Sequence, residues 1–286
     1  MSAFPKARRR VFAVLLAAAW LLSGCNAAMR IAYENADTFL HWRALSYVPL
    51  SGKAAEELDE RIDRFLAWHR AKALPQYARL AADAARRISA GLSPADLVWG
   101  YDSIIAQARE SLRAAAVQGA PLFDRLTPQQ ITHLERRVAE DNRRFQRENL
   151  RGSERERRRR RTERNVERLE DWVGRLSQAQ LERVKQYSER APLLDEFRDR
   201  DHKRIQAEFL AMVRAKEAKK RLPDLAANYD RGRDPAYVAA LEASRKEYVA
   251  MALDIDRSLS EHQRARAAGE LRRYADDFRT LAGERR

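Results

Sequence analysis

The only cysteine of this chain lies where its thiol could be acylated. Cys25 follows Leu22-Ser23-Gly24, and twelve apolar residues (11–22) precede it. Four cations come before that run; they are Lys6, Arg8, Arg9 and Arg10. Twelve helical residues reach about 18 Å, which is short of the roughly 30 Å hydrocarbon core of a bilayer. The pattern is typical of a bacterial lipobox, so we expect a lipoprotein signal peptide over residues 1–24 and a lipid on Cys25.

The lipobox also predicts where the mature chain works. Asn26, not aspartate, follows the cysteine, so we expect the chain to face the periplasm, anchored in the inner leaflet of the outer membrane. The alternative is a cleaved, unlipidated secreted protein in which Cys25 is lost or free. With one cysteine the chain forms no intramolecular disulfide, so its core alone must stabilise it.

A second group of residues could bind anions. Residues 143–168 contain twelve arginines and five glutamates. Arginine binds phosphate or carboxylate bidentately. The predicted anion-binding residues are Arg155, Arg157, Arg158, Arg159, Arg160, Arg161 and Arg164. The alternative is a solvated helix supported by pairs such as Glu154–Arg158 and Glu156–Arg160, and the sequence leaves both open.

The charge balance constrains the partners. The formal net charge is +14, which favours anionic partners. In a periplasmic setting these are anionic lipid, lipopolysaccharide or acidic polypeptide. We therefore expect contact with a membrane through the lipid on Cys25, an anionic lipid, lipopolysaccharide or protein partner, and no nucleic acid.

The elements that position these residues are predicted to be helices. Gly and Pro are scarce, and apolar residues recur at three and four. The sequence predicts an all-α bundle of seven to nine amphipathic helices in one domain over 25–286, or in two lobes divided near 146–165. The first helix is expected over 28–47, with Ile31, Phe39 and Trp42 on its apolar face, and a kink or break at Leu74-Pro75.

The sequence also predicts the apolar stripe of the third helix and the shape of the arginine-rich region. The third helix begins at Ser93-Pro94 and should bury a stripe of Leu97, Tyr101, Ile104/Ile105, Ala108 and Leu112. Residues 128–175 form either one long helix or a helical hairpin with its tip at Gly152-Ser153.

Several predicted helix starts share one pattern. It is Leu, then Ser or Thr, two residues and Gln, which makes a capping box behind a hydrophobic staple. The pattern occurs at Leu126–Gln130, Leu176–Gln180 and Leu259–Gln263, with a looser copy at Leu92–Asp96. These pentapeptides resemble the Leu-Thr-x-x-Gln motifs of the Spy/CpxP group of periplasmic helical chaperones. The alternative is that they are ordinary helix starts.

A broader resemblance extends over most of the mature chain. Its motifs are Tyr33-Glu34-Asn35-Ala36-Asp37-Thr38-Phe39-Leu40-His41-Trp42, Phe65-Leu66-Ala67-Trp68-His69-Arg70, Leu74-Pro75-Gln76-Tyr77 and Leu126-Thr127-Pro128-Gln129-Gln130. Together they resemble an uncharacterised family of helical envelope lipoproteins of Gram-negative bacteria. The resemblance implies location and fold but no activity.

No residue pattern indicates catalysis, a cofactor or a metal. The five histidines are scattered, and phosphate-loop, nucleophile-elbow and zinc spacings are lacking. We expect Asp199, Asp201 and His202 to form a solvated face. We expect core positions for the four tryptophans that remain after signal-peptide cleavage, which are Trp42, Trp68, Trp99 and Trp172.

The sequence therefore predicts a non-enzymatic lipoprotein that binds anionic or unfolded partners through a basic helical surface. The alternative is a structural or adaptor subunit of an envelope complex, and an enzyme is the third possibility. An exposed apolar patch would favour the first, a flat charged arm the second, and a pocket with converging carboxylates or histidines the third.

Overall fold

A computed structural model describes residues 25–283. The predicted signal peptide, residues 1–24, lies outside the described residues, and so does the side chain of Cys25. Within the described part the chain forms helices joined by loops, which confirms the all-α prediction. The α-helices are α2 (Cys25–Glu34), α3 (Ala36–Tyr47), α4 (Lys53–Trp68), α5 (Leu74–Ala90), α6 (Pro94–Phe123), α7 (Pro128–Asn149), α8 (Glu154–Val173), α9 (Gln178–Arg190), α10 (Asp195–Arg214), α11 (Ala218–Ala227), α12 (Pro235–Ser258) and α13 (Glu261–Ala282).

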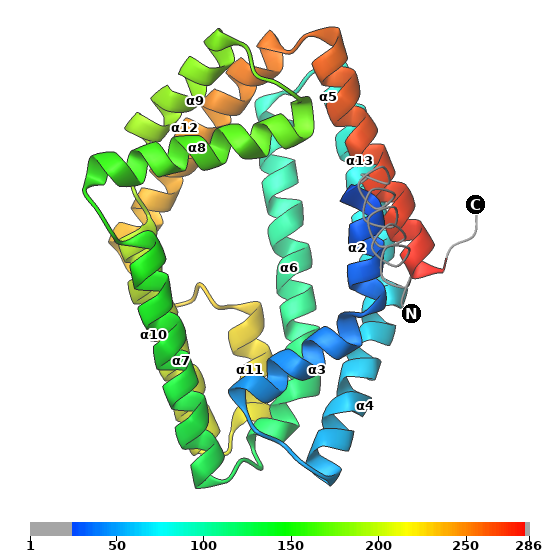
Figure 1. Ribbon diagram of the computed structural model, residues 1–286, viewed down its shortest axis with the longest axis vertical. Helices are drawn as coiled ribbons and strands as arrows, with labels where there is room; N and C mark the ends of the chain where they lie inside the picture. Colours follow the sequence, from blue (N-terminus) through cyan, green and yellow to red (C-terminus); the bar gives the residue numbers. More distant parts are fainter. Residues whose placement is uncertain (1–24, 284–286) are drawn as a thin grey trace, which may run out of the picture.

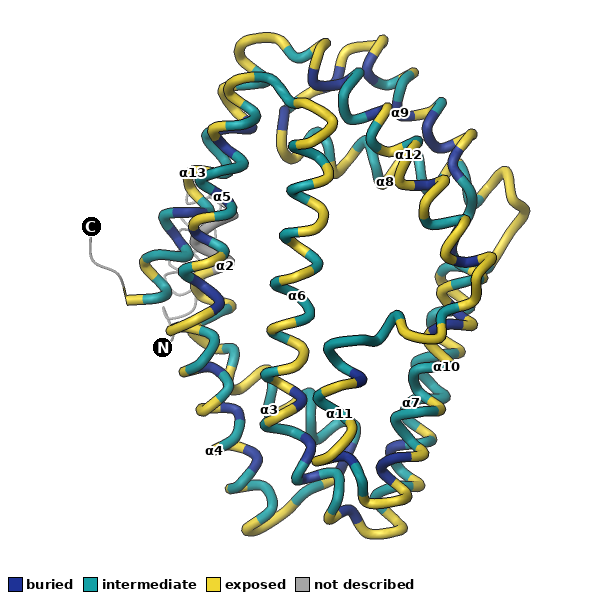
Figure 2. Tube along the Cα trace, turned by 180° about the vertical axis from the view of Figure 1, so that it is seen from behind, coloured by how far each residue is buried: buried dark blue, intermediate teal, exposed yellow. Residues whose placement is uncertain are grey.

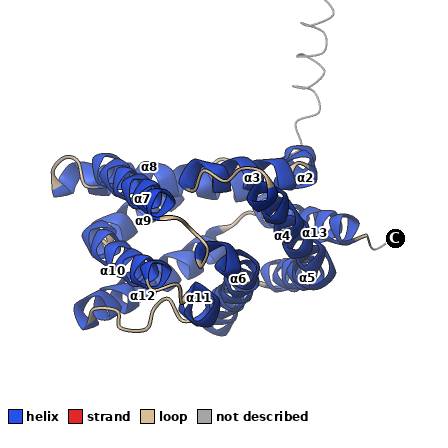
Figure 3. Ribbon diagram, turned by 90° about the horizontal axis from the view of Figure 1, so that it is seen from below, coloured by secondary structure: helices blue, strands red, loops and turns tan. Residues whose placement is uncertain are grey.

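The helices form a frame around one long central helix (Figure 1). Helices α7 and α10 pack together along one side, and α5 packs against α13 along the other. Helices α8, α9 and α12 close one end, while α3 and α11 lie toward the other. Helix α6 runs between the two ends and packs mainly on α11 and α4 through its C-terminal part. Seen from below, the elements form two layers, with α2, α3, α7 and α8 in one of them (Figure 3).

The core is divided among three clusters rather than gathered at the centre. One joins α8, α9, α12 and α13 around Val184 and Ile255. A second joins α7 and α10 to the end of α6 around Leu134 and Val213. The third holds α4 against α3 and α6 around Leu66. The clusters stabilise the ends and corners of the frame, so much of α6 lies outside them.

The structure has more helices than the predicted seven to nine. Even with α4, the π-helical turn η1 (His69–Ala73) and α5 counted as one continuous segment, the described residues contain eleven. Two unpredicted breaks account for much of the difference. The expected helix over 28–47 breaks at Asn35, between α2 and α3. The region after Pro192 breaks at Lys216, whose φ of 57° is left-handed and incompatible with a continuing helix.

The predicted kink or break at Leu74-Pro75 corresponds to an irregular but unbroken stretch of helix. Proline lacks an N–H group, and its ring clashes with the preceding turn of a regular α-helix. The regular helix α4 ends at Trp68, and the π-helical turn η1 leads directly into Leu74 and Pro75 of α5. The chain is therefore helical without a break, and its irregular turn lies where the proline would disturb a regular helix.

The arginine-rich region is neither one long helix nor a packed hairpin. Helices α7 and α8 meet at a corner formed by residues 150–153 (Figure 1). Gly152 adopts φ 84° there. Ser153 then begins α8 with a capping box to Glu156.

Candidate binding site

The most unusual surface of the molecule lies on α6. Its sequence is apolar on several sides, and a helix of that kind is normally buried. Among residues 94–115, all of which the structure describes, none is buried; the first buried residue of α6 is Ala116. Figure 2 shows this part of the helix in the colours of intermediate and exposed residues. Monomeric proteins seldom leave such an apolar surface uncovered unless it binds something.

The predicted core stripe of α6 is therefore partly solvent-exposed, so the expectation of a buried stripe was wrong. Tyr101 is 49% exposed, Ile104 is 67% exposed and Leu112 is 49% exposed. The reason is tertiary: the clusters of the frame pack against the C-terminal part of α6 and leave its middle without a complete cover.

Two adjoining cavities lie beside this exposed stretch. The larger, about 510 Å³, lies among α5, α6, α9 and α12, and its wall includes Leu97, Tyr101, Leu241 and Tyr248. The smaller, about 370 Å³, lies among α5, α6 and α13. Both are lined by Ala84, Trp99, Gly100 and Ile104. We call the two cavities and the exposed residues of α6 beside them the α6 groove.

The chemistry of the α6 groove is apolar and aromatic. All the residues lining the smaller cavity are uncharged, and they include Tyr77 and Phe278, whose rings meet edge to face at 5.7 Å. Gly100 faces open space: a Cβ there would meet nothing within 4 Å. Apolar lining with a few polar groups is typical of binding pockets of this size.

Two arginines border the larger cavity. The Arg87 guanidinium carbon lies 4.1 Å from the centroid of the Trp99 ring, and its charge is paired with Asp96. The hydroxyl and amide of Ser93 donate to Asp96 and, with Arg87, hold the pKa of that carboxyl at about 2. Arg245 lies over the Tyr101 ring at 5.5 Å. The cavity thus combines an apolar wall with the Arg87–Asp96 ion pair and one further cation, Arg245, at its rim.

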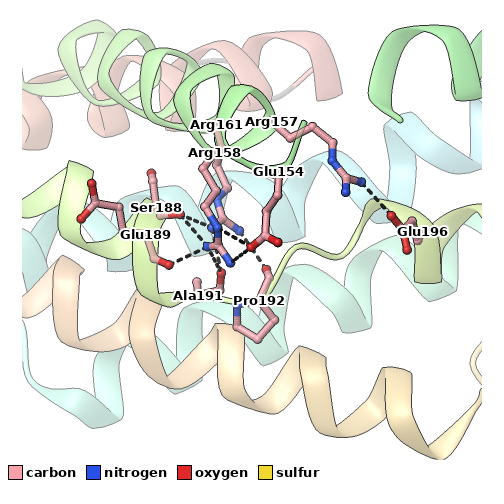
Figure 4. Close-up of polar contacts among 9 residues, drawn as sticks. All are labelled: Glu154, Arg157, Arg158, Arg161, Ser188, Glu189, Ala191, Pro192 and Glu196. Carbon is pink, nitrogen blue, oxygen red and sulfur yellow. Dashed lines mark hydrogen bonds and ion pairs between the residues drawn. The ribbon is translucent and has the colours of Figure 1, made fainter. Parts of the chain in front are cut away.

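The arginine segment has a different structural role from the groove. Figure 4 shows Arg158 and Arg161 of α8 directed at the end of α9. Arg158 donates to the carbonyl oxygens of Ser188 (3.0 Å), Glu189 (2.6 Å) and Ala191 (2.9 Å). Arg161 donates to the carbonyl oxygens of Ser188, Ala191 (2.8 Å) and Pro192 (2.8 Å). The last carbonyls of a helix lack partners within it, so the two guanidinium groups cap α9.

The other five predicted anion-binding residues are divided between internal contacts and the surface. Arg157 pairs with Glu196 at 3.0 Å and its side chain is 14% exposed. Arg160 donates to the carbonyl oxygen of Arg151. Arg155, Arg159 and Arg164 are exposed, and Arg159 lies 3.6 Å from Glu163. The structure therefore does not bring all seven arginines together. Arg155, Arg158 and Arg159 line one cavity of about 640 Å³ with Lys185 and three glutamates, and the other four lie outside it.

The chain matches the model of a family of unknown function, DUF6279, over residues 46–237. The chain belongs to this family. The match includes α6 and α8 and agrees with the expected uncharacterised family, while the resemblance to Spy/CpxP chaperones stays a prediction. No curated protein and no solved structure matched the chain.

The burial of some tryptophan and aspartate side chains in this DUF6279 member differs from the sequence prediction. Trp42 is 62% exposed and Trp172 is 38% exposed, so neither is a core residue as predicted. Of the expected solvated face, His202 is exposed but Asp199 and Asp201 are buried. Their charges are compensated, since Asp199 pairs with Lys203 and Asp201 pairs with Arg204 and Arg233.

The described residues contain neither a candidate metal site nor a candidate membrane-spanning helix. No group of three or more His, Cys, Asp or Glu side chains there is arranged to hold a metal ion. Within residues 25–283 we also find no helix with the length and apolar character that a membrane crossing requires.

Sequence reasoning missed the α6 groove, although one clue was available. Apolar residues of α6 extend beyond a single stripe, since Val98 and Trp99 flank the predicted face. An excess of this kind predicts either complete burial or an uncovered binding surface.

Proposed function

We propose that this chain is a lipid-anchored envelope protein that binds unfolded polypeptide segments through the α6 groove. The lipobox at Cys25 supports an anchor in the inner leaflet of the outer membrane, with the body facing the periplasm. The observation that carries the binding role is the uncovered apolar face of α6 with its two adjoining cavities. The protein acts by binding, without catalysis.

The dimensions of the groove suit an extended polypeptide. The residues of α6 that line the two cavities extend from Asp96 to Ala108. At 1.5 Å per residue this stretch is about 18 Å long, which an extended chain spans with about five residues. Apolar side chains of such a segment would fill the cavities, and Arg245 at the rim would favour segments that also carry an acidic residue.

An anionic partner at the arginine segment is a separate part of this proposal. It depends on the exposed residues Arg155, Arg159 and Arg164, because Arg158 and Arg161 are engaged with α9. An adaptor role in an envelope complex would use this same surface. The apolar groove is the observation that favours the binding of unfolded polypeptide over the adaptor role.

Binding of a permanently unfolded polypeptide tests the proposal. The probe is a reduced and alkylated, fluorescently labelled protein, and its anisotropy is measured as the mature lipoprotein in detergent is added. The double variant Tyr101→Glu, Ile104→Glu should weaken binding at least tenfold, since it places two charges in an apolar groove. The control is Val238→Glu, which changes a side chain on α12 that is 40% exposed and lines neither cavity.

Equal affinities for wild type and the double variant, with helical circular dichroism unchanged, would contradict the assignment of the groove. If only Val238→Glu weakens binding, the site lies elsewhere on the frame.

A further inference from the structure

Helices α2 and α3 expose three large apolar side chains. Ile31 is 61% exposed, Phe39 is 59% exposed and Trp42 is 62% exposed. The rings of Phe39 and Trp42 are in contact, with centroids 6.4 Å apart. We call these three residues the α2–α3 patch. The sequence places them on the apolar face of one helix, yet the structure leaves them without a cover.

The exposure is not a result of loose packing of these helices. The opposite side of α3 packs through Leu40, Ala44 and Leu45 onto the cluster around Leu66. Helix α2 contacts α13, and the Tyr33 hydroxyl lies 2.9 Å from Nδ1 of His69. Both helices are therefore fixed to the frame while the patch faces away from it.

The patch lies close to the predicted site of lipid attachment. Helix α2 begins at Cys25 itself, so no flexible linker separates the predicted lipidation site from α2. At 1.5 Å per residue, Phe39 lies at most about 21 Å and Trp42 at most about 26 Å from Cys25 along the helices. Figures 1 and 3 show α2 and α3 next to each other in one layer of the molecule. A lipid at Cys25 would hold this face against the bilayer.

We propose that the α2–α3 patch inserts into the interfacial layer of the membrane that holds the lipid, and so fixes the orientation of the frame. The inference rests on the lipid anchor in the proposed function and does not depend on the α6 groove. Tryptophan favours this layer because its ring is apolar and its indole N–H is polar. A second contact beside an acyl anchor also strengthens membrane attachment.

The charges around the patch indicate how it would bind. Arg30 and Arg43 are offset by Glu34, Asp37 and Asp59 on the same helices and on α4. The neighbourhood therefore has no cationic excess to attract anionic lipid. Insertion should depend on apolar area and be insensitive to salt, unlike binding at the arginine segment.

Quenching of tryptophan fluorescence by brominated lipid tests the inference. The full mature lipoprotein is reconstituted into phosphatidylcholine vesicles with bromine atoms on the upper acyl chain. Wild type, Trp42→Phe and Trp172→Phe are compared; Trp172 is a partly exposed control, 38% exposed on α8. We expect Trp42→Phe to remove at least half of the quenching seen in wild type, in low salt and in 1 M salt, and Trp172→Phe to leave most of it.

Three results would overturn the inference. One is vesicle-bound protein whose quenching is the same in wild type and Trp42→Phe. A second is a concentration-dependent dimer that Trp42→Phe abolishes, which would assign the patch to another copy of the chain. The third is failure of the processed wild-type protein to float with vesicles, which would overturn the anchor as well. Loss of polypeptide binding in the α6 groove would affect none of these three results.

Discussion

The side-chain amides of Gln180 and Gln263 donate to each other: each Nε2 lies 3.1 Å from the Oε1 of its partner. Gln180 also accepts from the Ser177 amide, and Gln263 accepts from the Ser260 amide, so each belongs to a capping box. The starts of α9 and α13, which are 83 residues apart in sequence, are thus hydrogen-bonded to each other. The Leu-Ser-x-x-Gln pattern has a structural role at both sites.

Gln180→Ala should destabilise the fold by about 1–3 kcal/mol, because Gln180 is 1% exposed and its loss leaves buried partners unsatisfied. Gln263→Ala should be less costly alone, and the two changes should be non-additive. Urea denaturation of both single variants and the double variant measures this coupling. Gln130→Ala, in the capping box of α7, is the control, and additive effects of Gln180→Ala and Gln263→Ala would contradict the pairing.

Arg161→Ala should destabilise the fold by about 1–3 kcal/mol, since it removes the arginine donor of the Pro192 carbonyl and one of the two arginine donors of the Ser188 and Ala191 carbonyls. Its burial lowers the pKa of Arg161, but the guanidinium stays charged. Arg159→Ala should change stability by less than about 0.5 kcal/mol, because that side chain is 73% exposed. The check is the denaturation midpoint, and equal midpoints for the two variants would refute the capping role.

Anion binding must be tested at the exposed arginines, because Arg158 and Arg161 cap α9. Replacing Arg157–Arg161 together would damage the fold as well as the surface. Changing Arg155, Arg159 and Arg164 to Gln should leave stability nearly unchanged and weaken binding to lipopolysaccharide or anionic vesicles. The binding of wild type should also fall as salt is added. Retained affinity in this triple variant would show that the segment is a solvated helix.

The start of α6 should be sensitive to acid through Asp96. Its folded pKa, about 2, lies below its ordinary value of 3.8. A depressed pKa means that this carboxylate contributes stability above about pH 4, and that the contribution is lost as pH falls toward 2. The free energy of unfolding should therefore fall less steeply between pH 4 and pH 2 in Asp96→Asn than in wild type. Identical slopes would show that the Ser93 and Arg87 contacts do not stabilise the charged form.

Cys25→Ser should abolish the lipid anchor. The variant should either be soluble in the periplasm or accumulate as an uncleaved precursor, because the acyl acceptor is gone. Fractionation of cells followed by mass determination distinguishes the two forms. A correctly cleaved Cys25→Ser protein that still fractionates with the membrane would be incompatible with lipid anchoring.

Local features of this fold could be predicted from sequence, because they depend on neighbouring residues. The helical content and the capping boxes at Thr127 and Ser177 are confirmed. Contacts between distant segments could not be predicted. Periodicity shows that Tyr101 and Leu112 share a face of α6, but not whether another helix covers it. Likewise, the spacing of Arg158 and Arg161 does not show that the end of α9 lies beside them.

Site-specific photo-crosslinking in living cells tests whether the α6 groove binds unfolded polypeptide. A photoreactive amino acid is placed at Ile104 in the α6 groove, and in a second strain at Val238 outside it. We expect position 104 to crosslink to many polypeptides, and more strongly when unfolded envelope proteins accumulate, while position 238 does not. Equal crosslinking at both positions, or none at position 104, would contradict the claim that the groove binds unfolded polypeptide.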